Sequence, residues 1–425
     1  MAYNAYITEI KDVNKHSNAD RLQVGKCFGN QVIVGLDVKE GDIGVYFPSD
    51  GQLGVEYCDE NNLVRKKDKD GNNIGGYLDP DKRNIRALKL RGEISDGLFM
   101  PLESLASFTN ITKLKVGELI NVLDGVEICK KYIPISNQHK SSNSNSSKKK
   151  VKVIKYPYFN EHKDTKQLAY CMANFSEGDI CYITLKMHGT SGRTSYTKSV
   201  EPRFKNSVLK KIFHDPKRES WSLMTGTRRV VLENYDGGFY GSNSFRQKYH
   251  DIFDGKLRKG ETVYYEIVGY MDSDRPIMGA VNNNKTNDKD FVKKYGETTV
   301  YSYGCEPGTN EIYIYRMSIL DAEGNEIDYP WDYVKTRADQ MGLKVVHEFD
   351  RFIYTTQEDL MQRINKYVDG VDPIGLTHIR EGVVVRIEGK EQFKAYKHKN
   401  FTFKLLEGII KDSGEVDIEE AQEII

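Results

Sequence analysis

A lysine at the end of a short apolar run is well placed for chemistry in this chain. Lys186 closes the alternating run 183–185, and the turn that follows it, 187–193, contains the sequence His-Gly-Thr-Ser. A strand-end lysine beside a turn that lets the backbone approach a ligand suits phosphate-directed chemistry with the amine as nucleophile. A lysine in a surface turn is also common, and Lys-x-x-Gly occurs by chance in long chains. The rest of the sequence has to decide between these interpretations.

Four further stretches follow Lys186 in order and carry residue types that a nucleotide site needs. They are a glycine turn with paired arginines at 225–230, a strand with one carboxylate at 263–269, an aromatic strand at 312–317, and a Glu-Gly strand at 381–386 closely followed by a lysine-rich strand at 394–400. Each alone has an ordinary explanation, such as Glu266 at a strand edge or Tyr315 in a core. The ordered set is harder to explain in this way.

Together these residue types can assemble a site for a nucleoside triphosphate. Lys397 and Lys399 alternate onto the same face of their strand, so both can reach one phosphate and one neighbouring amine. Neighbouring cations lower the pKa of a lysine, and lysines with a divalent cation stabilise the charge on an attacked α-phosphate. Glu266 and Glu381 can hold that cation or the ribose hydroxyls. Tyr315 offers an aromatic face to a flat base.

The same residues carry a resemblance to a known family. Lys186-x-His188-Gly189, followed in order by the Glu, aromatic, Glu-Gly and Lys-x-Lys-Asn stretches, resembles the covalent nucleotidyltransferases. The histidine in place of the Asp of Lys-x-Asp-Gly, together with the Lys-x-Lys-Asn-x-x-Phe sequence that begins at Lys397, is most similar to ATP-dependent RNA ligases that seal nicks. The resemblance covers roughly 156–405, and as an ordered set of five motifs it is specific.

The resemblance implies a three-step reaction. The Lys186 amine would take AMP from ATP as a lysyl-AMP phosphoramidate and release pyrophosphate. The AMP would pass to an RNA 5′-phosphate, and a 3′-hydroxyl would then displace it to seal the strand. ATP and Mg²⁺ or Mn²⁺ would be the cofactors, and RNA ends or a nicked duplex containing RNA would be the partners. His188 would serve the steps after lysine adenylation, although a structural hydrogen bond from its ring is an equal alternative.

The resemblance also implies roles for the other matching positions. Catalysis would involve Lys186, His188, Glu381, Lys397 and Lys399. The nucleotide would be bound by Thr184, Leu185, Gly189, Arg228, Glu266, Tyr315, Lys397 and Lys399, and the metal by Glu266 and Glu381. Arg228 matches the arginine that touches the ribose or the end to be joined, although Arg229 or Arg193 could take that role. RNA contacts are expected from Lys89, Arg91, Arg193 and Arg229. Leu185 departs from the pattern, because many relatives carry Glu before the nucleophile.

The elements that must position these residues predict an α+β chain of two domains joined by a linker. Residues 1–135 predict an OB-fold β-barrel, because short alternating runs at 21–27, 31–35 and 41–48 are separated by Gly and Asn turns. The segment 16–22 is similar to the start of tRNA-binding OB domains. An OB module before a ligase domain resembles one subgroup of RNA ligases.

Positive charge in the first domain gathers at 85–92. Alternation puts Arg86 opposite Lys89 and Arg91 if this stretch is one regular strand, so a single basic face is not guaranteed. A strand edge kept charged against aggregation and a contact with nucleic acid are equally good interpretations.

Residues 136–155 predict a flexible linker, because Ser-Asn repeats and a lysine cluster run without one acidic residue. Residues 156–425 predict the nucleotidyltransferase domain, built on antiparallel sheets with flanking helices. Within it, the insert 202–221 carries seven basic residues, counting His214, and no motif. It is either a loop that contacts substrate or a plain surface excursion.

The second domain mixes predicted strands and helices. Strands are expected at 181–185, 262–268, 311–317 and 382–387. One helix is expected at 331–341, closed by Gly342, and another at 356–368, with Thr355 and Glu358 as a capping box.

Composition narrows the class of protein. A length of 425 residues favours two domains, and a formal net charge of zero means that a polyanion binder must concentrate its positive charge locally. The six cysteines form no Cys-x-x-Cys pair, which argues against a zinc ribbon or a disulfide framework and fits a reducing compartment. The sequence contains neither a signal-peptide pattern nor an apolar run of membrane-spanning length. We expect a cytoplasmic monomer.

Three alternatives remain open. DNA ligases and mRNA-capping guanylyltransferases resemble this domain but carry a following OB domain, and only 21 residues follow Lys404 here. ATP rather than GTP follows from the resemblance alone, since stacking on Tyr315 suits any purine. A non-catalytic RNA-binding protein with a decayed ligase domain is disfavoured, because all the expected ionisable positions are filled.

Overall fold

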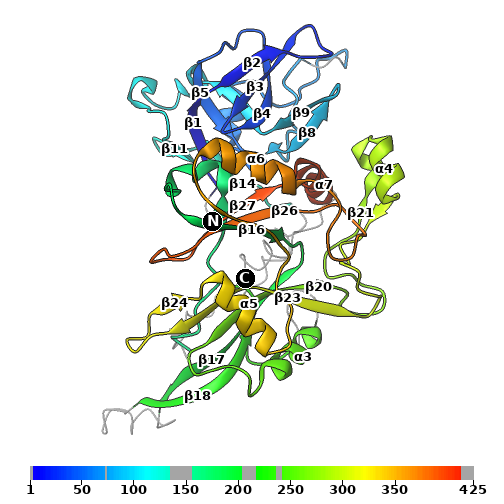
Figure 1. Ribbon diagram of the computed structural model, residues 1–425. Helices are drawn as coiled ribbons and strands as arrows, with labels where there is room; N and C mark the ends of the chain where they lie inside the picture. Colours follow the sequence, from blue (N-terminus) through cyan, green and yellow to red (C-terminus); the bar gives the residue numbers. More distant parts are fainter. Residues whose placement is uncertain (1–2, 72–73, 135–155, 203–216, 236–241, 413–425) are drawn as a thin grey trace. The chain divides into compact units, whose positions relative to one another are not determined.

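The computed structural model describes residues 3–71, 74–134, 156–202, 217–235 and 242–412. The chain divides into two compact units, one of Met1–His139 with Phe401–Glu415 and one of Lys140–Asn400 with Val416–Ile425 (Figure 1). The expected linker at 136–155 and the centre of the basic insert lie outside the described residues.

The first unit is built from short antiparallel strands. Its elements are β1 (Ala5–Glu9), β2 (Lys11–Lys15), β3 (Leu22–Cys27), β4 (Asn30–Gly35), β5 (Ile43–Phe47), β6 (Gly51–Leu53), α1 (Val55–Glu60), β7 (Asn84–Ile85), β8 (Ala87–Leu90), β9 (Glu93–Asp96), β10 (Leu98–Pro101), β11 (Leu119–Ile120), β12 (Val122–Leu123), β13 (Val126–Glu127) and β14 (Cys129–Lys131). They form the ladders β10-β5-β1-β11, β2-β3-β4, β14-β6-β7, β8-β9 and β12-β13. β3, β4 and β5 confirm the three strands expected from the alternating runs.

The stretch 85–92 is not one regular strand. β7 ends at Ile85, β8 begins at Ala87, and positive φ angles of 48° at Arg91 and 98° at Gly92 turn the chain into β9. Lys89 and Arg91 are exposed on this hairpin. The buried His16 has its Nε2 atom 3.2 Å from the Leu90 carbonyl oxygen, which fixes the hairpin against the segment 16–22.

Helix α7 (Phe401–Asp412) belongs to the first unit although it follows the last strand of the second. An ion pair joins Lys404 to Asp96, and Lys411 Nζ lies 3.0 Å from Asp50 Oδ1. The second unit therefore ends at Asn400 in the described residues, which is earlier than the sequence predicted.

The second unit consists of two larger sheets with helices. Its elements are β15 (Lys166–Gln167), β16 (Ile180–Lys186), β17 (Thr190–Pro202), β18 (Lys217–Gly226), β19 (Val231–Leu232), α3 (Ser244–Phe253), β20 (Thr262–Gly269), β21 (Val281–Asn282), α4 (Lys289–Tyr295), β22 (Thr298–Thr299), β23 (Asn310–Leu320), β24 (Glu326–Asp328), α5 (Trp331–Gln340), β25 (Glu348–Ile353), α6 (Gln357–Val368), β26 (Gly382–Ile387) and β27 (Lys394–Lys399).

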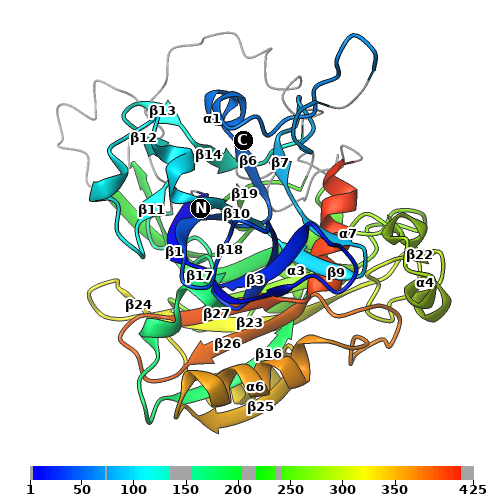
Figure 2. The ribbon, with the colours of Figure 1, turned by 90° about the horizontal axis from the view of Figure 1, so that it is seen from above.

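The two larger sheets of this unit have the orders β15-β27-β26-β16-β25 and β19-β18-β17-β20-β23-β24, and β21 and β22 form a separate two-stranded sheet. All their neighbours are antiparallel except β15 and β27. Helix α6 packs along the five-stranded sheet (Figure 2). The core under α6 contains the apolar stripe Leu360, Ile364 and Val368 together with Val383 and Val385 of β26. The mixed α+β class and the antiparallel sheets are confirmed.

The predicted strands and helices of this unit are confirmed with small shifts. β26 has the predicted bounds, while β23 extends three residues beyond the prediction, to Leu320. The predicted cap of α6 was wrong by one residue: Thr356, not Thr355, is the N-cap, and its side chain accepts a hydrogen bond from the Asp359 amide. Both threonines precede an acidic residue at the capping spacing, so the sequence alone did not separate them.

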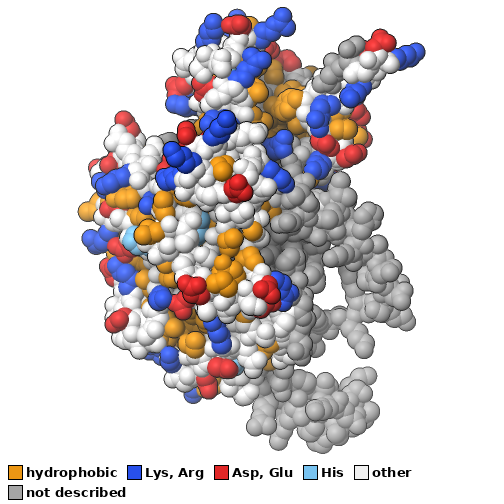
Figure 3. All heavy atoms as spheres, turned by 90° about the vertical axis from the view of Figure 1, so that its right-hand side faces the viewer, with side chains coloured by type: hydrophobic (Ala, Val, Ile, Leu, Met, Phe, Trp, Pro, Cys, Tyr) orange, Lys and Arg blue, Asp and Glu red, His pale blue; other side chains and the backbone are white. Residues whose placement is uncertain are grey.

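On the face drawn in Figure 3, acidic and basic side chains are interspersed among the described residues. This distribution agrees with the formal net charge of zero. No helix among the described residues has the length and apolarity needed to cross a membrane.

Candidate active site

A cavity that opens to solvent lies in the second unit, lined by residues of both larger sheets. Its walls are His162, Thr165, Thr184, Leu185, Lys186, Met187, Ser191, Arg228, Glu266, Tyr315, Val346, Val384, Arg386, Phe393, Ala395 and Lys397. The cavity therefore brings together most of the residues that the sequence selected from five separate stretches.

Lys186 is the last residue of β16, and its register partner on β26 is Gly382. Its Nζ atom lies 2.7 Å from Glu381 Oε1, and its side chain is 18% exposed. Strand β16 is buried along most of its length and pairs on both edges, so the lysine projects from a rigid element. A lysine held in this way keeps a fixed position while its amine remains within reach of a ligand.

Glu381 is a buried carboxylate at the centre of a positive cluster. Its Oε1 atom is 3.6 Å from Lys399 Nζ, and its Oε2 atom is 3.8 Å from His188 Nδ1. Burial by itself would raise the pKa of Glu381, but Lys186, Lys399 and His188 together hold this pKa below its ordinary value. The carboxylate is therefore ionised, and its Oε2 atom accepts no hydrogen bond from the described residues.

The Lys-x-Lys-Asn sequence of β27 places its members differently. Lys397 lines the cavity, whereas Lys399 contacts Glu381. The Asn400 amide donates to the Glu381 carbonyl oxygen at 2.8 Å, and its side-chain amide bonds to Asp369 at the end of α6. Asn400 thus fixes the strand end from which Lys399 reaches the site.

His188 is held mainly by aromatic neighbours. Its backbone amide donates to the Tyr303 hydroxyl at 2.7 Å, and its ring meets the Tyr301 ring edge-on with centroids 4.7 Å apart. The ring nitrogen facing Glu381 is too distant for a direct hydrogen bond. The structural and the chemical interpretations of His188 therefore both stay open.

At two glycines near the site, the backbone of a neighbouring strand lies too close to leave room for a side chain. A Cβ atom on Gly189 would lie 2.3 Å from the carbonyl oxygen of Ile267 in β20. Gly382 has a φ angle of 154°, and a Cβ atom there would lie 2.2 Å from the His398 carbonyl oxygen. Gly189 is not among the cavity-lining residues, and its close approach to Ile267 gives it a packing role where β17 meets β20, while its nucleotide contact stays a prediction.

The six-stranded sheet supplies the opposite wall. Glu266 of β20 is 7% exposed, and the Ser191 hydroxyl donates to it at 3.5 Å. Tyr315 of β23 is half-buried, and a hydrogen bond of 3.2 Å joins its hydroxyl to His162 Nδ1. Thr184 and Leu185 line the wall formed by the other sheet.

Arg193 does not have the surface position expected of an RNA contact. It is 1% exposed, its Nε donates to the Thr227 carbonyl at 2.8 Å, and its Nη1 donates to the carbonyls of Phe159 and Asn160. Its guanidinium also stacks 4.2 Å from the Phe159 ring. Burial and internal hydrogen bonds occupy the Arg193 guanidinium, which favours a structural role, and its contact with RNA or the ribose stays a prediction.

The paired arginines of the 225–230 turn both contact Asp164. Arg228 Nε donates to Asp164 Oδ1 at 2.9 Å, and Arg229 Nη2 lies 3.4 Å from Asp164 Oδ2. Arg228 also lines the cavity, and its contact with the nucleotide stays a prediction. Lys89 and Arg91 belong to the first unit and are not part of this cavity.

Sequence reasoning missed several cavity residues. His162 and Thr165 lie just after the expected linker in a stretch without motif, and Phe393 lies in the loop before β27. Arg386 was inside a quoted strand, and its alternation with Val384 could have placed it on the cavity face. For His162 the sequence holds no comparable signal.

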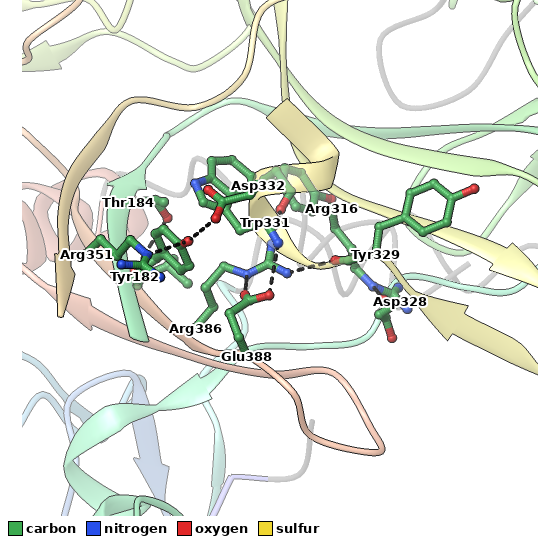
Figure 4. A network of polar contacts seen from close by, with 12 residues as sticks. Tyr182, Thr184, Arg316, Asp328, Tyr329, Trp331, Asp332, Arg351, Arg386 and Glu388 are labelled. Carbon is green, nitrogen blue, oxygen red and sulfur yellow. Dashed lines mark hydrogen bonds and ion pairs between the residues drawn. The ribbon is translucent and has the colours of Figure 1, made fainter. Parts of the chain in front are cut away.

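Arg386 forms a polar network at the cavity wall, shown in Figure 4. Its Nε lies 2.5 Å from Glu388 Oε1, and its Nη2 donates to the Tyr329 carbonyl at 3.2 Å. Glu388 in turn accepts from the Trp331 amide at 2.9 Å. Since Arg386 lies in β26 and Glu388 directly follows it, while Tyr329 and Trp331 follow β24, this network ties the two larger sheets of the unit together.

Among the described residues, no group of three or more His, Cys, Asp and Glu side chains is arranged to hold a metal ion by itself. Glu381, with its unsatisfied Oε2 atom, and Glu266 nevertheless fit a cation that takes its other ligands from a phosphate and water, as Mg²⁺ commonly does.

Comparison with known protein families identifies the fold of the first domain. A family model described as an OB-fold domain matches residues 4–102. No curated protein sequence matches the chain. The OB fold expected for the first domain is therefore confirmed over this range.

The whole chain resembles solved structures of the RNA ligase of Naegleria gruberi. An apo variant of that enzyme matches with a TM-score of 0.57 and 15% identity over 95% of this chain and 98% of that one. A complex of it with pyrophosphate gives 0.56 and 15% over 94% and 97%, and a variant with AMP and Mn gives 0.55 and 14% over 94% and 98%. At this identity the match shows a shared fold, which agrees with the resemblance drawn from the motifs.

Proposed function

We propose that this chain is an ATP-dependent RNA ligase that joins a 3′-hydroxyl to a 5′-phosphate through a lysyl-AMP intermediate. The observation that carries the proposal is the cluster of Lys186, Glu381 and Lys399 beside the cavity, with Nζ–Oε1 distances of 2.7 and 3.6 Å. A strand-end amine next to a second lysine and a buried carboxylate is what nucleophilic attack on a phosphate requires. The RNA ligase fold supports the same function.

In the first step, the Lys186 amine attacks the α-phosphorus of ATP. A nitrogen–phosphorus bond forms, the bond between the α-phosphorus and the bridging oxygen breaks, and pyrophosphate leaves while the amine loses a proton. The amine forms an ion pair with Glu381, so binding of the nucleotide must weaken that pair before the amine can attack. Lys397 and Lys399, on one face of β27, are placed to neutralise the α-phosphate.

The cavity walls supply the nucleotide contacts. Val384 of β26 and Tyr315 of β23 come from opposite sheets and can enclose a flat base between them. Glu266 can accept hydrogen bonds from the ribose hydroxyls. A divalent cation held at Glu381 would supply charge neutralisation at the phosphates, and Glu266 could share in binding it.

In the later steps the AMP is transferred to the 5′-phosphate of an RNA end, and the 3′-hydroxyl of the adjoining strand displaces it. The first unit, with an OB fold matched over 4–102, is suited to engage the nucleic acid. Lys89 and Arg91 are exposed there and are the side chains we propose for phosphate contacts, with Arg229 as a candidate on the second unit.

The first test is covalent labelling with ATP or GTP that is radioactive at the α-phosphate. We expect ATP to give acid-labile, base-stable label on the protein, and Lys186→Ala to abolish it. Lys390→Ala is the matched control, because Lys390 forms an ion pair of the same 2.7 Å length with Asp179 outside the cavity. Labelling by GTP alone would favour a capping-type enzyme, and absence of label with both nucleotides would end the enzymatic proposal.

The second test addresses the substrate. Sealing of nicked duplexes is measured with RNA or DNA on the 3′-hydroxyl strand, and we expect RNA to be required at that position.

Lys397→Ala and Lys399→Ala should lose lysine adenylation while the fold is kept. Near-normal labelling of both variants would contradict the phosphate role of these lysines.

A further inference from the structure

The residues that precede the first strand of the second unit form an irregular segment that three arginines hold in place. Segment 159–165 contains no helix or strand among its residues. Arg193 binds the carbonyls of Phe159 and Asn160, while Arg228 and Arg229 bind Asp164. A segment without its own ladder of hydrogen bonds needs such external partners to stay ordered.

The arginine contacts bring His162 and Thr165 into the wall of the cavity. The His162 amide donates to the Arg228 carbonyl oxygen at 3.2 Å, so the same turn that binds Asp164 also fixes the backbone at His162. Segment 159–165 therefore forms part of the cavity wall, although it belongs to neither of the two larger sheets.

His162 contacts the aromatic residue expected to stack on the base. Its Nδ1 atom is hydrogen-bonded to the Tyr315 hydroxyl at 3.2 Å, and the two rings meet edge-on at 87° with centroids 5.5 Å apart. A tyrosine fixed both at its strand and at its hydroxyl keeps its ring at one angle. Because Nδ1 is used by Tyr315, Nε2 is the ring atom left to meet a base in the cavity.

The charges around His162 keep its ring neutral. Burial, together with the positive charges of Arg228, Arg316 and Arg193, lowers its pKa to about 3 against the opposing effect of Asp164. A neutral imidazole carries one donor and one acceptor, so the proton position on Nε2 depends on whether Tyr315 donates or accepts. When the Nδ1–H group donates to the Tyr315 oxygen, Nε2 is an acceptor and complements a base edge with an amino group, as in adenine, but not one with a carbonyl.

We propose that His162 is a specificity-determining residue of the nucleotide site, which positions Tyr315 and hydrogen-bonds the edge of the purine base. The inference rests on the proposed function, and it assigns to the arginine-bound segment 159–165 the discrimination between adenine and guanine. This role would also compensate for the apolar side chain of Leu185, which lines the cavity but cannot hydrogen-bond to a base.

The test measures lysine adenylation with ATP and with GTP in the wild type, in His162→Ala and in His162→Gln. We expect His162→Ala to raise the KM for ATP roughly 5- to 10-fold, the worth of one hydrogen bond, with a much smaller change in kcat. The preference for ATP over GTP should fall by a similar factor. His162→Gln should recover part of the loss, because its amide can still bond to the Tyr315 hydroxyl or to the base.

His250→Gln is the matched control. His250 is also half-buried and hydrogen-bonded through Nδ1 to a hydroxyl, that of Thr225 at 3.1 Å, but it does not line the cavity. It should keep the wild-type KM and the wild-type nucleotide preference. An equal effect of His250→Gln and His162→Ala would overturn the inference, since a general loss of stability would then explain both.

Other outcomes separate this inference from the function on which it rests. If the wild type is labelled but His162→Ala weakens ATP and GTP equally, His162 only supports Tyr315 and the specificity role is wrong. If His162→Ala has no effect in the Tyr315→Phe background, His162 acts solely through the tyrosine hydroxyl, and the direct base contact is likewise excluded. Absence of label in the wild type would instead refute the proposed function itself.

Discussion

Replacing Glu381 by Gln tests the cluster of Lys186, Glu381 and Lys399. We expect the replacement to lower the free energy of unfolding and to abolish lysine adenylation. Glu381 is 2% exposed, with Lys186 Nζ at 2.7 Å and Lys399 Nζ at 3.6 Å. At an effective dielectric constant of about 20, these distances correspond to gross attractions of about 6 and 5 kcal/mol. Desolvation of the buried carboxylate, several kcal/mol per ion, offsets a large part of that gain.

Without the carboxylate, the two lysines repel one another in a partly buried site. Breaking a buried pair typically costs about 3–5 kcal/mol, and because the amide oxygen of Gln still accepts from one lysine we expect a loss of about 2–4 kcal/mol in the free energy of unfolding. Lysine adenylation should be lost, since the proposed cation would lose an anionic ligand. The fold should remain, because the variant conserves the volume of the side chain.

Intrinsic tryptophan fluorescence in urea is a specific assay for this effect. The chain has two tryptophans, and both Trp221 and Trp331 belong to the second unit, so the signal reports the unit that holds the site. Glu311→Gln is the control: it forms an exposed ion pair with Lys344 in the same unit and should change stability by less than about 1 kcal/mol. A Glu381→Gln variant as stable as this control would refute the reasoning.

The pH dependence gives a second check with a defined sign. The pKa of Glu381 is lowered in the folded state, so its stabilising contribution is fully present above its ordinary value of 4.5 and is lost as the pH falls through the lowered value. The gap in stability between wild type and Glu381→Gln should therefore close in acid. A gap that stays constant from neutral pH to about pH 2 would contradict the assignment of an ionised Glu381.

Three further variants test particular contacts. Arg193→Met should destabilise the second unit by about 2–4 kcal/mol, because buried carbonyls lose their donors. An unchanged urea midpoint together with a reduced affinity for RNA would contradict this structural role and would favour a contact between Arg193 and RNA. Gly189→Ala should impair adenylation by at least tenfold and lower Tm, since its Cβ would lie 2.3 Å from the Ile267 carbonyl oxygen; wild-type labelling would show that the turn can move. Lys411→Met should destabilise the first unit by about 1–3 kcal/mol, because it leaves Asp50 without this partner; amide hydrogen exchange in that unit measures the effect, and unchanged exchange would argue against α7 as part of it.

The order of the motifs and the location of the strands could be predicted from the sequence. Lys186 could be selected because alternation ends there and small residues follow, which is local information. The Glu-Gly and Lys-x-Lys-Asn stretches could be added because each combines strand periodicity with charged residues on one face. The resemblance to RNA ligases followed from that order, and the fold similarity agrees with it.

Most element boundaries and the cap of α6 could be predicted from the sequence to about one residue, whereas the end of β23 was placed three residues too early. The strand at 382–387 was placed correctly because an unbroken apolar run follows a glycine. The cap of α6 was misplaced by one residue because Thr355 and Thr356 each satisfy the same local rule. The membership of α7 in the first unit was not foreseen, since its ion pairs join residues more than 300 positions apart, such as Lys404 and Asp96.

Strand alternation and turn composition are local properties, so the sequence alone indicated which residue types could perform phosphate chemistry. Which arginines face inward depends on tertiary packing: Arg193 is buried against Phe159 because the chain before β15 folds back onto β17. Only tertiary packing brought His162 to Tyr315, a contact across 153 residues. Contacts of that separation depend on how whole sheets pack, and no local pattern encodes them.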